Sequence, residues 1–357
     1  MKKPLKFLLS SKFKTQKRPQ KKGGFTLIEL LVGLIMGALI ITPLLGFMIN
    51  VMSSDRQEQA KSASEQEIQT ALDYISRDVS QAIFIYDGFG VQSLVSNNTL
   101  PRPAGESTPV LVFWKREIKP KILPNNPNND GQDDAFALSL VAYYLIKDTT
   151  CSGTSTWSCT ARIGRVQMDE AVKDPIDETR PPIVPANPPN FTTPFVPATT
   201  TTAPTSALAQ TLEQRMNNWT TADLTGVQVQ TLIDYVDQTT LTNGSPPITA
   251  CSTEGRDGRP DAPNPLPAGY DGKAVPYTFR QTPNDSSTVP ASLKTGSFYA
   301  CVYKDKDKPD LAQVFIRGNS LARISSKNNP PEYSANKTAY FPKASIQVQG
   351  RGLIGQD

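Results

Sequence analysis

The chain has 357 residues, of which 38% are hydrophobic and 20% charged, and its formal net charge is +4. It contains no histidine, which excludes Ser-His-Asp and Cys-His catalysis and histidine-ligated zinc. A hydrolase that uses two carboxylates stays open, because Asp and Glu are plentiful and their spacing in the sequence cannot reveal such a pair.

The positive charge is concentrated at the N-terminus. The 24 residues before Phe25 hold nine Lys or Arg and no acid, so the rest has 28 basic and 33 acidic side chains, a net charge of −5. We expect residues 1–24 to stay in the cytoplasm and the rest of the chain to face outward, because basic segments are retained inside. The pI near 8.7 therefore gives no indication of nucleic-acid binding.

An almost wholly apolar run follows, from Phe25 to Ile49. As a helix its 25 residues would span roughly 37 Å, enough to cross a bilayer core. Glu29 is the only charge in the run, and an unpaired carboxylate near the membrane midplane costs about 2.5 kcal/mol or more. If the bond between Gly24 and Phe25 is cut, the new amino group of one chain could neutralise Glu29 of a neighbouring chain.

The helix is expected to continue from this transmembrane half, residues 25–49, into an amphipathic half, residues 50–86. An apolar stripe at helical spacing predicts the second half, and polar residues are expected opposite it. The stripe consists of Ile68, Leu72, Ile75, Val79, Ala82 and Ile83, and the polar side of Asp73, Arg77, Asp78 and Gln81. Gly88 and Gly90 are expected to end the helix near Ile85. Pro43 should bend it or loosen a turn near Leu39, unless neighbouring helices or Thr42 satisfy the freed groups.

Strands are predicted after the helix, so the fold class is α+β, with the helix laid across an antiparallel sheet. The predicted strands are 109–115, 136–146, 297–303, 313–317 and 344–349. Residues 136–146 lack clean alternation, which predicts burial on both faces or beneath the helix. The sheet head should comprise residues 87–172 and 291–357.

Residues 173–290 interrupt this head with a Pro/Thr-rich loop and what we interpret as an inserted lobe. The composition of residues 173–204 predicts an exposed, extended loop. Two helices are expected within the lobe, at 207–219 and 227–237.

Four cysteines, Cys151, Cys159, Cys251 and Cys301, lie on the expected exported side, where disulfides persist. Three pairings are possible, and we favour Cys151 with Cys159 and Cys251 with Cys301, because the first pair brackets a short, turn-rich loop. A metal site is the alternative, although it would need closer paired spacing or histidine support.

Three further features of the sequence could indicate a bound ligand, and each has a simpler interpretation. Asn126, Asn128, Asp130 and Asp134 place oxygen atoms as in a calcium loop, but the bidentate acid is missing, and a solvated turn is the simpler interpretation. Residues 350–355 match the dinucleotide-binding spacing, which we reject because no helix follows. The side chains of Trp114, Trp157 and Trp219 could stack on sugars, with core or loop packing as the simpler alternative.

The string Gly24-Phe25-Thr26-Leu27-Ile28-Glu29 resembles the class III signal of type IV pilins and pseudopilins. The stretches 70–82 and 313–319 resemble the larger minor pilins of the PilW and J-type group. Residues 42–48, 55–61, 110–116 and 140–145 are similar to the HpsC-type pseudopilins of hormogonium polysaccharide secretion in cyanobacteria. The signal is specific for the pilin class, and the assignment within the class depends on looser strings.

This resemblance implies a type IV pilin-like fold and a structural, non-enzymatic subunit without a cofactor. A prepilin peptidase would cut after Gly24 and methylate the amine of Phe25, and Glu29 would hold subunit register. The subunit would sit in the inner membrane by a single pass and enter a pseudopilus or pilus. Its partners would be other pseudopilins or pilins, an inner-membrane platform protein, an assembly ATPase and, in secretion and gliding motility, a polysaccharide. A pilus-tip adhesin or glycan-binding minor pilin, and a membrane-anchored carboxylate hydrolase, are the alternatives.

Overall fold

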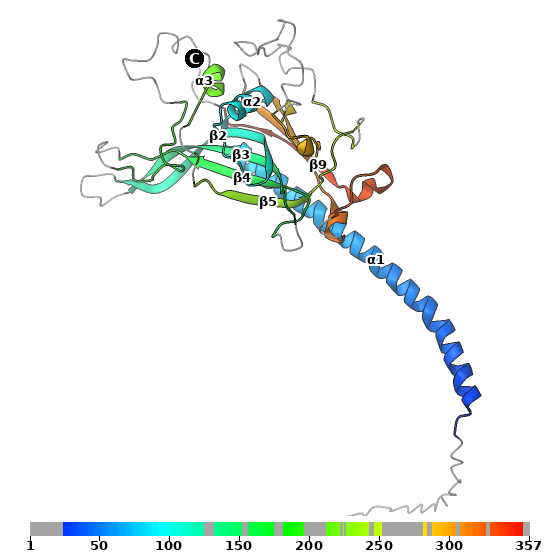
Figure 1. Cartoon of the computed structure of the whole chain (residues 1–357). Coiled ribbons are helices and arrows are strands. Elements are labelled where there is room, and N and C mark those ends of the chain that lie inside the picture. The colour runs from blue at the N-terminus through cyan, green and yellow to red at the C-terminus, as the bar shows by residue number, and fades with distance from the viewer. Residues whose placement is uncertain are drawn as a thin grey trace, which may run out of the picture. The chain divides into compact units, whose positions relative to one another are not determined.

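The computed structural model describes residues 24–124, 132–151, 156–174, 181–195, 212–221, 224, 226–242, 246–251, 281–283, 288–304, 308–325 and 329–352. The chain divides into two compact units, Met1–Asp55 and Arg56–Asp357. Helix α1, Leu27–Val79, includes residues of both units (Figure 1). The α+β class and the order expected from the resemblance to type IV pilins, a long helix followed by antiparallel sheet, are confirmed.

The described strands form two antiparallel sheets in the second unit. The first sheet has the order β1-β2-β3-β4-β5, with β1 Ala82–Ile85, β2 Glu106–Pro124, β3 Gln132–Lys147, β4 Ala161–Asp169 and β5 Val229–Val236. The second has the order β6-β7-β8-β9, with β6 Gln281–Thr282, β7 Phe298–Tyr303, β8 Leu311–Arg317 and β9 Lys343–Gln349. Short helices connect them: α2 Gly88–Ser96, α3 Leu212–Asn217, η2 Ala291–Leu293, η3 Ser320–Arg323 and η4 Ala335–Tyr340.

The edges of the two sheets are joined. At one corner Val236 of β5 forms an isolated bridge with Gly318, just beyond β8. At the other, the N–H group of Arg351 donates to the carbonyl of Ala82 in β1 at 2.6 Å, and the N–H group of Ile85 donates to Asp310 Oδ2 at 2.9 Å. The first sheet therefore shares its backbone hydrogen bonds with segments of the second at both ends.

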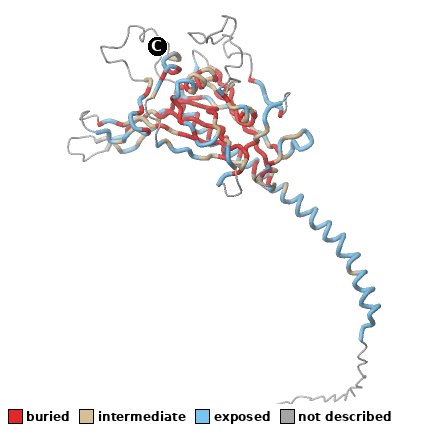
Figure 2. The backbone as a smooth tube through the Cα atoms, viewed as in Figure 1, coloured by how far each residue is buried: buried red, intermediate tan, exposed pale blue. Residues whose placement is uncertain are grey.

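Two hydrophobic cores lie on opposite faces of the first sheet, and the buried residues are concentrated in the part of the chain that holds the sheets (Figure 2). The inner core combines residues of α1 with residues of both sheets, and its largest members include Ile68, Leu72, Ile75, Phe113, Tyr143 and Phe298. The outer core lies between the first sheet and α2, α3 and the chain near Phe191. Successive residues of a strand point to opposite faces, so the central part of β3 is buried on both, as its lack of alternation predicted.

The strands predicted at 109–115, 136–146, 297–303, 313–317 and 344–349 are confirmed, although β2 and β3 extend further. Three other predictions were wrong. The helix ends at Val79, so Ala82 and Ile83 belong to strand β1. Gly88 and Gly90 begin α2, where Asp87 accepts a hydrogen bond from the N–H group of Gly90 at 2.7 Å. Residues 229–236, expected as a helix, form strand β5.

Strand β5 forms because β-branched residues occupy the alternate positions 229, 231 and 233 and the segment pairs with β4, and such pairing overrides weak helical spacing. It lies within residues 173–290, as does β6, so parts of this range belong to the sheets. Helix α3 confirms part of the helix predicted at 207–219, and residues 207–211 are outside the described residues.

Candidate functional site

The predicted processing site lies directly before α1. Residues 24–26 are not helical, and Glu29 is in the first turn of the helix. The N–H group of Glu29 donates to the carbonyl of Thr26 at 3.0 Å and to its hydroxyl at 3.3 Å. Thr26 thus caps the helix, and Thr-x-x-Glu is the spacing of a capping box, a sequence signal that marks the start of a helix here.

The helix beyond this cap is apolar and exposed. Residues 24–56 are all exposed apart from Gly37, which is partly buried (Figure 2). Within the described residues, α1 is the helix that is long and apolar enough to cross a membrane, with a mean hydropathy of 2.4 in its apolar window. Phe25, 83% exposed, and Ile28, 71% exposed, precede the acid at position 29. Such a surface requires lipid or other apolar helices around it.

Pro43 does not interrupt α1, which runs through it. Proline has no N–H group to donate to the carbonyl of Leu39. The hydroxyl of Thr42 donates instead to the carbonyl of Ala38 at 2.7 Å, one residue before the group that proline leaves free.

A buried ionic cluster holds the other end of α1. Asp78 accepts hydrogen bonds from Lys115 of β2 at 3.0 Å, Tyr143 of β3 at 2.8 Å and Arg165 of β4 at 2.7 Å. We call these four residues the Asp78 cluster. The prediction that Asp78 lies on the polar side of the helix was wrong, because it is only 7% exposed.

The cluster is electrostatically matched. Burial raises the pKa of Asp78, but the hydrogen bond and charge of Arg165, together with Lys115, outweigh burial and bring that pKa below its ordinary value. The pKa of Tyr143 is raised by burial and by the neighbouring Asp78 carboxylate, so its hydroxyl stays a donor. Three donors from adjacent strands therefore surround one ionised acid.

The sequence indicates the Asp78 cluster only through the position of Asp78 on the buried face of the helix. Asp78 follows Ile75 by three residues and Ala71 by seven, spacings that put all three on one face. Lys115 likewise ends the apolar run of β2. Their mutual contact depends on the strand register, which places Lys115 opposite Ser139 and Tyr143 opposite Arg165.

A second polar contact holds α1 nearer the middle of the helix. The Nε atom of Arg323, in η3, donates to the hydroxyl of Ser64 at 3.0 Å, and its terminal nitrogen pairs with Glu67. The Tyr340 hydroxyl of η4 donates to Gln57 Oε1 at 2.7 Å. Segments from the end of the chain thus fasten the helical part that belongs to the second unit.

A third group of charges surrounds Lys304, which lies 3.6 Å from Asp310 and over the ring of Phe84. Burial raises the pKa of Asp87 to about 6; Lys304 opposes this rise, and the charge of Glu213 adds to it. Burial lowers the pKa of Lys304, but Asp310, Glu213 and Asp87 outweigh it, so the net shift is upward. We call the four charged residues Lys304, Asp310, Asp87 and Glu213 the Lys304 cluster.

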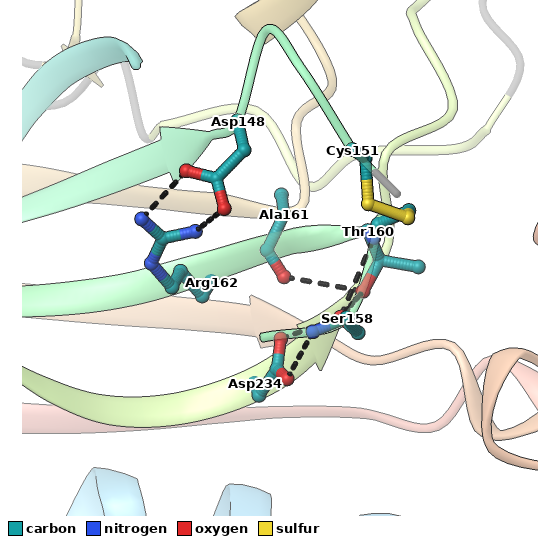
Figure 3. Close-up of a disulfide and its surroundings, with 8 residues drawn as sticks. Asp148, Cys151, Ser158, Thr160, Ala161, Arg162 and Asp234 are labelled. Atoms are coloured by element: carbon teal, nitrogen blue, oxygen red, sulfur yellow. Dashed lines mark hydrogen bonds and ion pairs between the residues drawn. A yellow bond between two sulfur atoms is a disulfide. The ribbon is translucent and has the colours of Figure 1, made fainter. Parts of the chain in front are cut away.

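The structure contains the disulfide pairs that we favoured, Cys151–Cys159 and Cys251–Cys301. Beside the first pair, Arg162 forms two hydrogen bonds with Asp148, at 2.7 and 2.8 Å (Figure 3). Ser158 donates its N–H group to Asp234 of β5 at 2.8 Å. The small loop is therefore attached to the edge strand of the first sheet.

The other predicted ligand sites are not assembled by the described residues. Asn126, Asn128 and Asp130 lie outside them, and Asp134 accepts a hydrogen bond from the N–H group of Lys121 at 2.9 Å. Among the described residues no group of three His, Cys, Asp or Glu could hold a metal ion. Core packing is confirmed for Trp114 and Trp219, whose rings meet edge to face, whereas Trp157 is 39% exposed.

Comparison with known protein families identifies a known motif in the N-terminal segment. Residues 19–45 match the family described as the prokaryotic N-terminal methylation motif. Searches of curated proteins and of solved structures found no match. The motif together with α1 supports a membrane-anchored, type IV pilin-like subunit that is structural, is processed by a prepilin peptidase and assembles with other pilins.

Proposed function

We propose that this chain is a minor pseudopilin of a type IV pilus or type II secretion-like assembly. The observation that carries the proposal is one acid, Glu29, in the first turn of a helix that begins just after Gly24 and Phe25 and whose residues up to Ile49 carry no other charge and are almost all exposed. Cleavage after Gly24 would give Phe25 a charged amine, and Glu29 of a neighbouring chain would pair with it inside the apolar surroundings.

The proposal also covers the orientation of the chain in the membrane, its assembly partners and the exported material. The residues before the cleavage site would face the cytoplasm, and the sheets would face the periplasm. An inner-membrane platform protein and an assembly ATPase would drive incorporation, and the exported material would be a polysaccharide used in gliding motility. The strings that resemble HpsC-type pseudopilins support this finer assignment.

The N-terminus of the protein recovered from native membranes tests the processing step. N-terminal sequencing and mass spectrometry are expected to find methylated phenylalanine at position 25. Recovery of the uncut chain from cells with an active prepilin peptidase would overturn the proposal.

The role of Glu29 requires a variant that separates charge from helix capping. Glu29→Gln removes the charge and keeps a side chain that suits the capping box. It should leave the protein membrane-bound and strongly reduce its incorporation into filaments, measured by crosslinking to sibling subunits. Glu65→Ala, at an exposed acid of the same helix, is the matched control. If Glu29→Gln assembled like the wild type, Glu29 would act through capping alone.

A further inference from the structure

A cavity of about 170 Å³ lies on the outer face of the second sheet, the face opposite the inner core. Its floor is formed by Tyr299 and Phe315, whose rings stack at 4.6 Å between centroids and 6° between planes. Residues 247–249 form one side, and Lys343 and Ser345 of β9 line it as well. At about 30 Å³ per water molecule it holds roughly six waters, space on the order of one sugar residue.

The side formed by residues 247–249 is held in place. The hydroxyl of Tyr299 donates to the carbonyl of Thr249 and accepts from its N–H group, both at 2.9 Å. Ile248 packs over Gly296, where a Cβ atom would lie 2.4 Å from the Ile248 methyl group and where φ is +57°. The Cys251–Cys301 disulfide ties the same segment to β7. The cavity is therefore preformed.

Two basic side chains line the cavity, and within the part of the chain that the structure describes only one of them is paired with an acidic side chain. Arg317 and Lys343 are cross-strand neighbours on β8 and β9. The guanidinium of Arg317 is engaged by Asp237 at 2.8 Å and by the carbonyl of Thr295 at 2.8 Å. Lys343 is exposed and forms no ion pair with any of the described residues. One positive charge is thus left available beside an aromatic floor.

We propose that this cavity binds a carbohydrate residue that carries a carboxylate. The C–H groups of a sugar ring carry partial positive charge and pack on the electron-rich face of an aromatic ring, here Phe315. Lys343 binds the carboxylate, and the hydroxyl of Ser345 is placed for a sugar hydroxyl. An apolar, aromatic pocket with a few convergent polar groups is the usual composition of small-ligand sites.

This site goes beyond the proposed assembly role and does not depend on it. The test therefore uses the purified full-length protein in detergent, without other subunits. Oligomers of galacturonate, glucuronate and mannuronate are titrated by calorimetry, with a neutral galactose oligomer of equal length for comparison. At least one acidic oligomer should bind, the neutral one at least about tenfold more weakly, and added salt should reduce the affinity.

Two variants locate the binding. Lys343→Gln should weaken binding of the acidic oligomer about tenfold or more, and Phe315→Leu, which keeps apolar bulk, about two- to tenfold. Lys337→Gln removes an exposed lysine of η4 outside the cavity and should bind like the wild type. Tryptophan fluorescence checks that each variant is folded.

The proposal is overturned if none of the three acidic oligomers binds, or if Lys343→Gln binds as tightly as the wild type. Equal affinity for the neutral oligomer would overturn the requirement for a carboxylate. None of these outcomes affects the processing of Phe25 or the assembly phenotype of Glu29→Gln, so failure of one proposal is distinguishable from failure of the other.

Discussion

The Nε atom of Arg165, in the middle of β4, lies 2.7 Å from Oδ2 of Asp78, the last residue but one of α1. The contact joins residues 87 positions apart, and both side chains are at most 10% exposed. Because Lys115 of β2 binds the other oxygen of Asp78 and the hydroxyl of Tyr143 of β3 also donates to Oδ2, one carboxylate connects the helix to three strands at once.

Replacing Asp78 with Asn should lower the free energy of unfolding by about 3 kcal/mol or more, because Lys115 and Arg165 would stay buried without their counter-charge. The pKa of Asp78 is lowered in the fold, so its stabilisation is present above the unfolded pKa and is lost as pH falls through the folded value. Denaturant unfolding at pH 7 and pH 3, followed by fluorescence of the buried tryptophans, measures both effects.

Asp73→Asn is the matched control, since Asp73 is exposed on the same helix. It should change stability by no more than about 0.5 kcal/mol. If Asp78→Asn were as stable as this control at pH 7, the cluster would not fasten the helix.

The wild-type protein should lose stability as the pH rises from about 4 to about 6, and replacing Asp87 with Asn should abolish this loss. Burial raises the pKa of Asp87 to about 6, so the folded protein holds this proton more tightly than the unfolded chain. Its stabilisation is present below the unfolded pKa of about 3.9 and is lost as pH rises through about 6. Asn also caps helices well, so α2 keeps its cap.

The difference in Tm between Asp87→Asn and the wild type should therefore become more positive from pH 4 to pH 7. Thermal scans of both proteins in one buffer series measure it, with Asp73→Asn as the reference. A difference independent of pH would show that the fold does not raise the pKa of Asp87.

The two disulfides should contribute unequally to the free energy of unfolding. Cys151–Cys159 closes a loop with a sequence separation of 8, and Cys251–Cys301 one of 50. Loop-closure entropy gives about 2.5 kcal/mol for the first and about 4 kcal/mol for the second. Paired substitution to Ala should destabilise the protein in that order, measured by denaturant unfolding. Equal losses would contradict the entropic account.

The long helix was predictable because its apolar spacing is regular over many turns, and the main strands because their β-branched runs are dense. The C-terminal end of the helix was not predictable, since residues 82–85 fit the apolar helical stripe equally well. Pairing with β2 decided the outcome and turned Ala82 and Ile85 into strand residues. Asp87 then starts a new helix, so the two glycines that we interpreted as a stop lie inside it.

The candidate sites divide in the same way. Gly24, Phe25 and Glu29 are close in sequence, and a local motif identifies them. The Asp78 cluster takes its members from α1, β2, β3 and β4, and only the strand register brings them together. The cavity beside Phe315 needs segments about 100 residues apart, from Pro247 to Ser345, so no local pattern could indicate it.

Two residues, Ser80 and Gln81, separate the end of α1 from β1. A force applied along α1 is therefore transmitted to the first sheet in two ways, through this short covalent link and through the ion pairs of Asp78. Lys115 and Arg165 belong to β2 and β4, the strands on either side of β3, so separating the helix from the sheet requires breaking contacts with more than one strand. A force along α1 is therefore distributed over β1, β2, β3 and β4 of the first sheet.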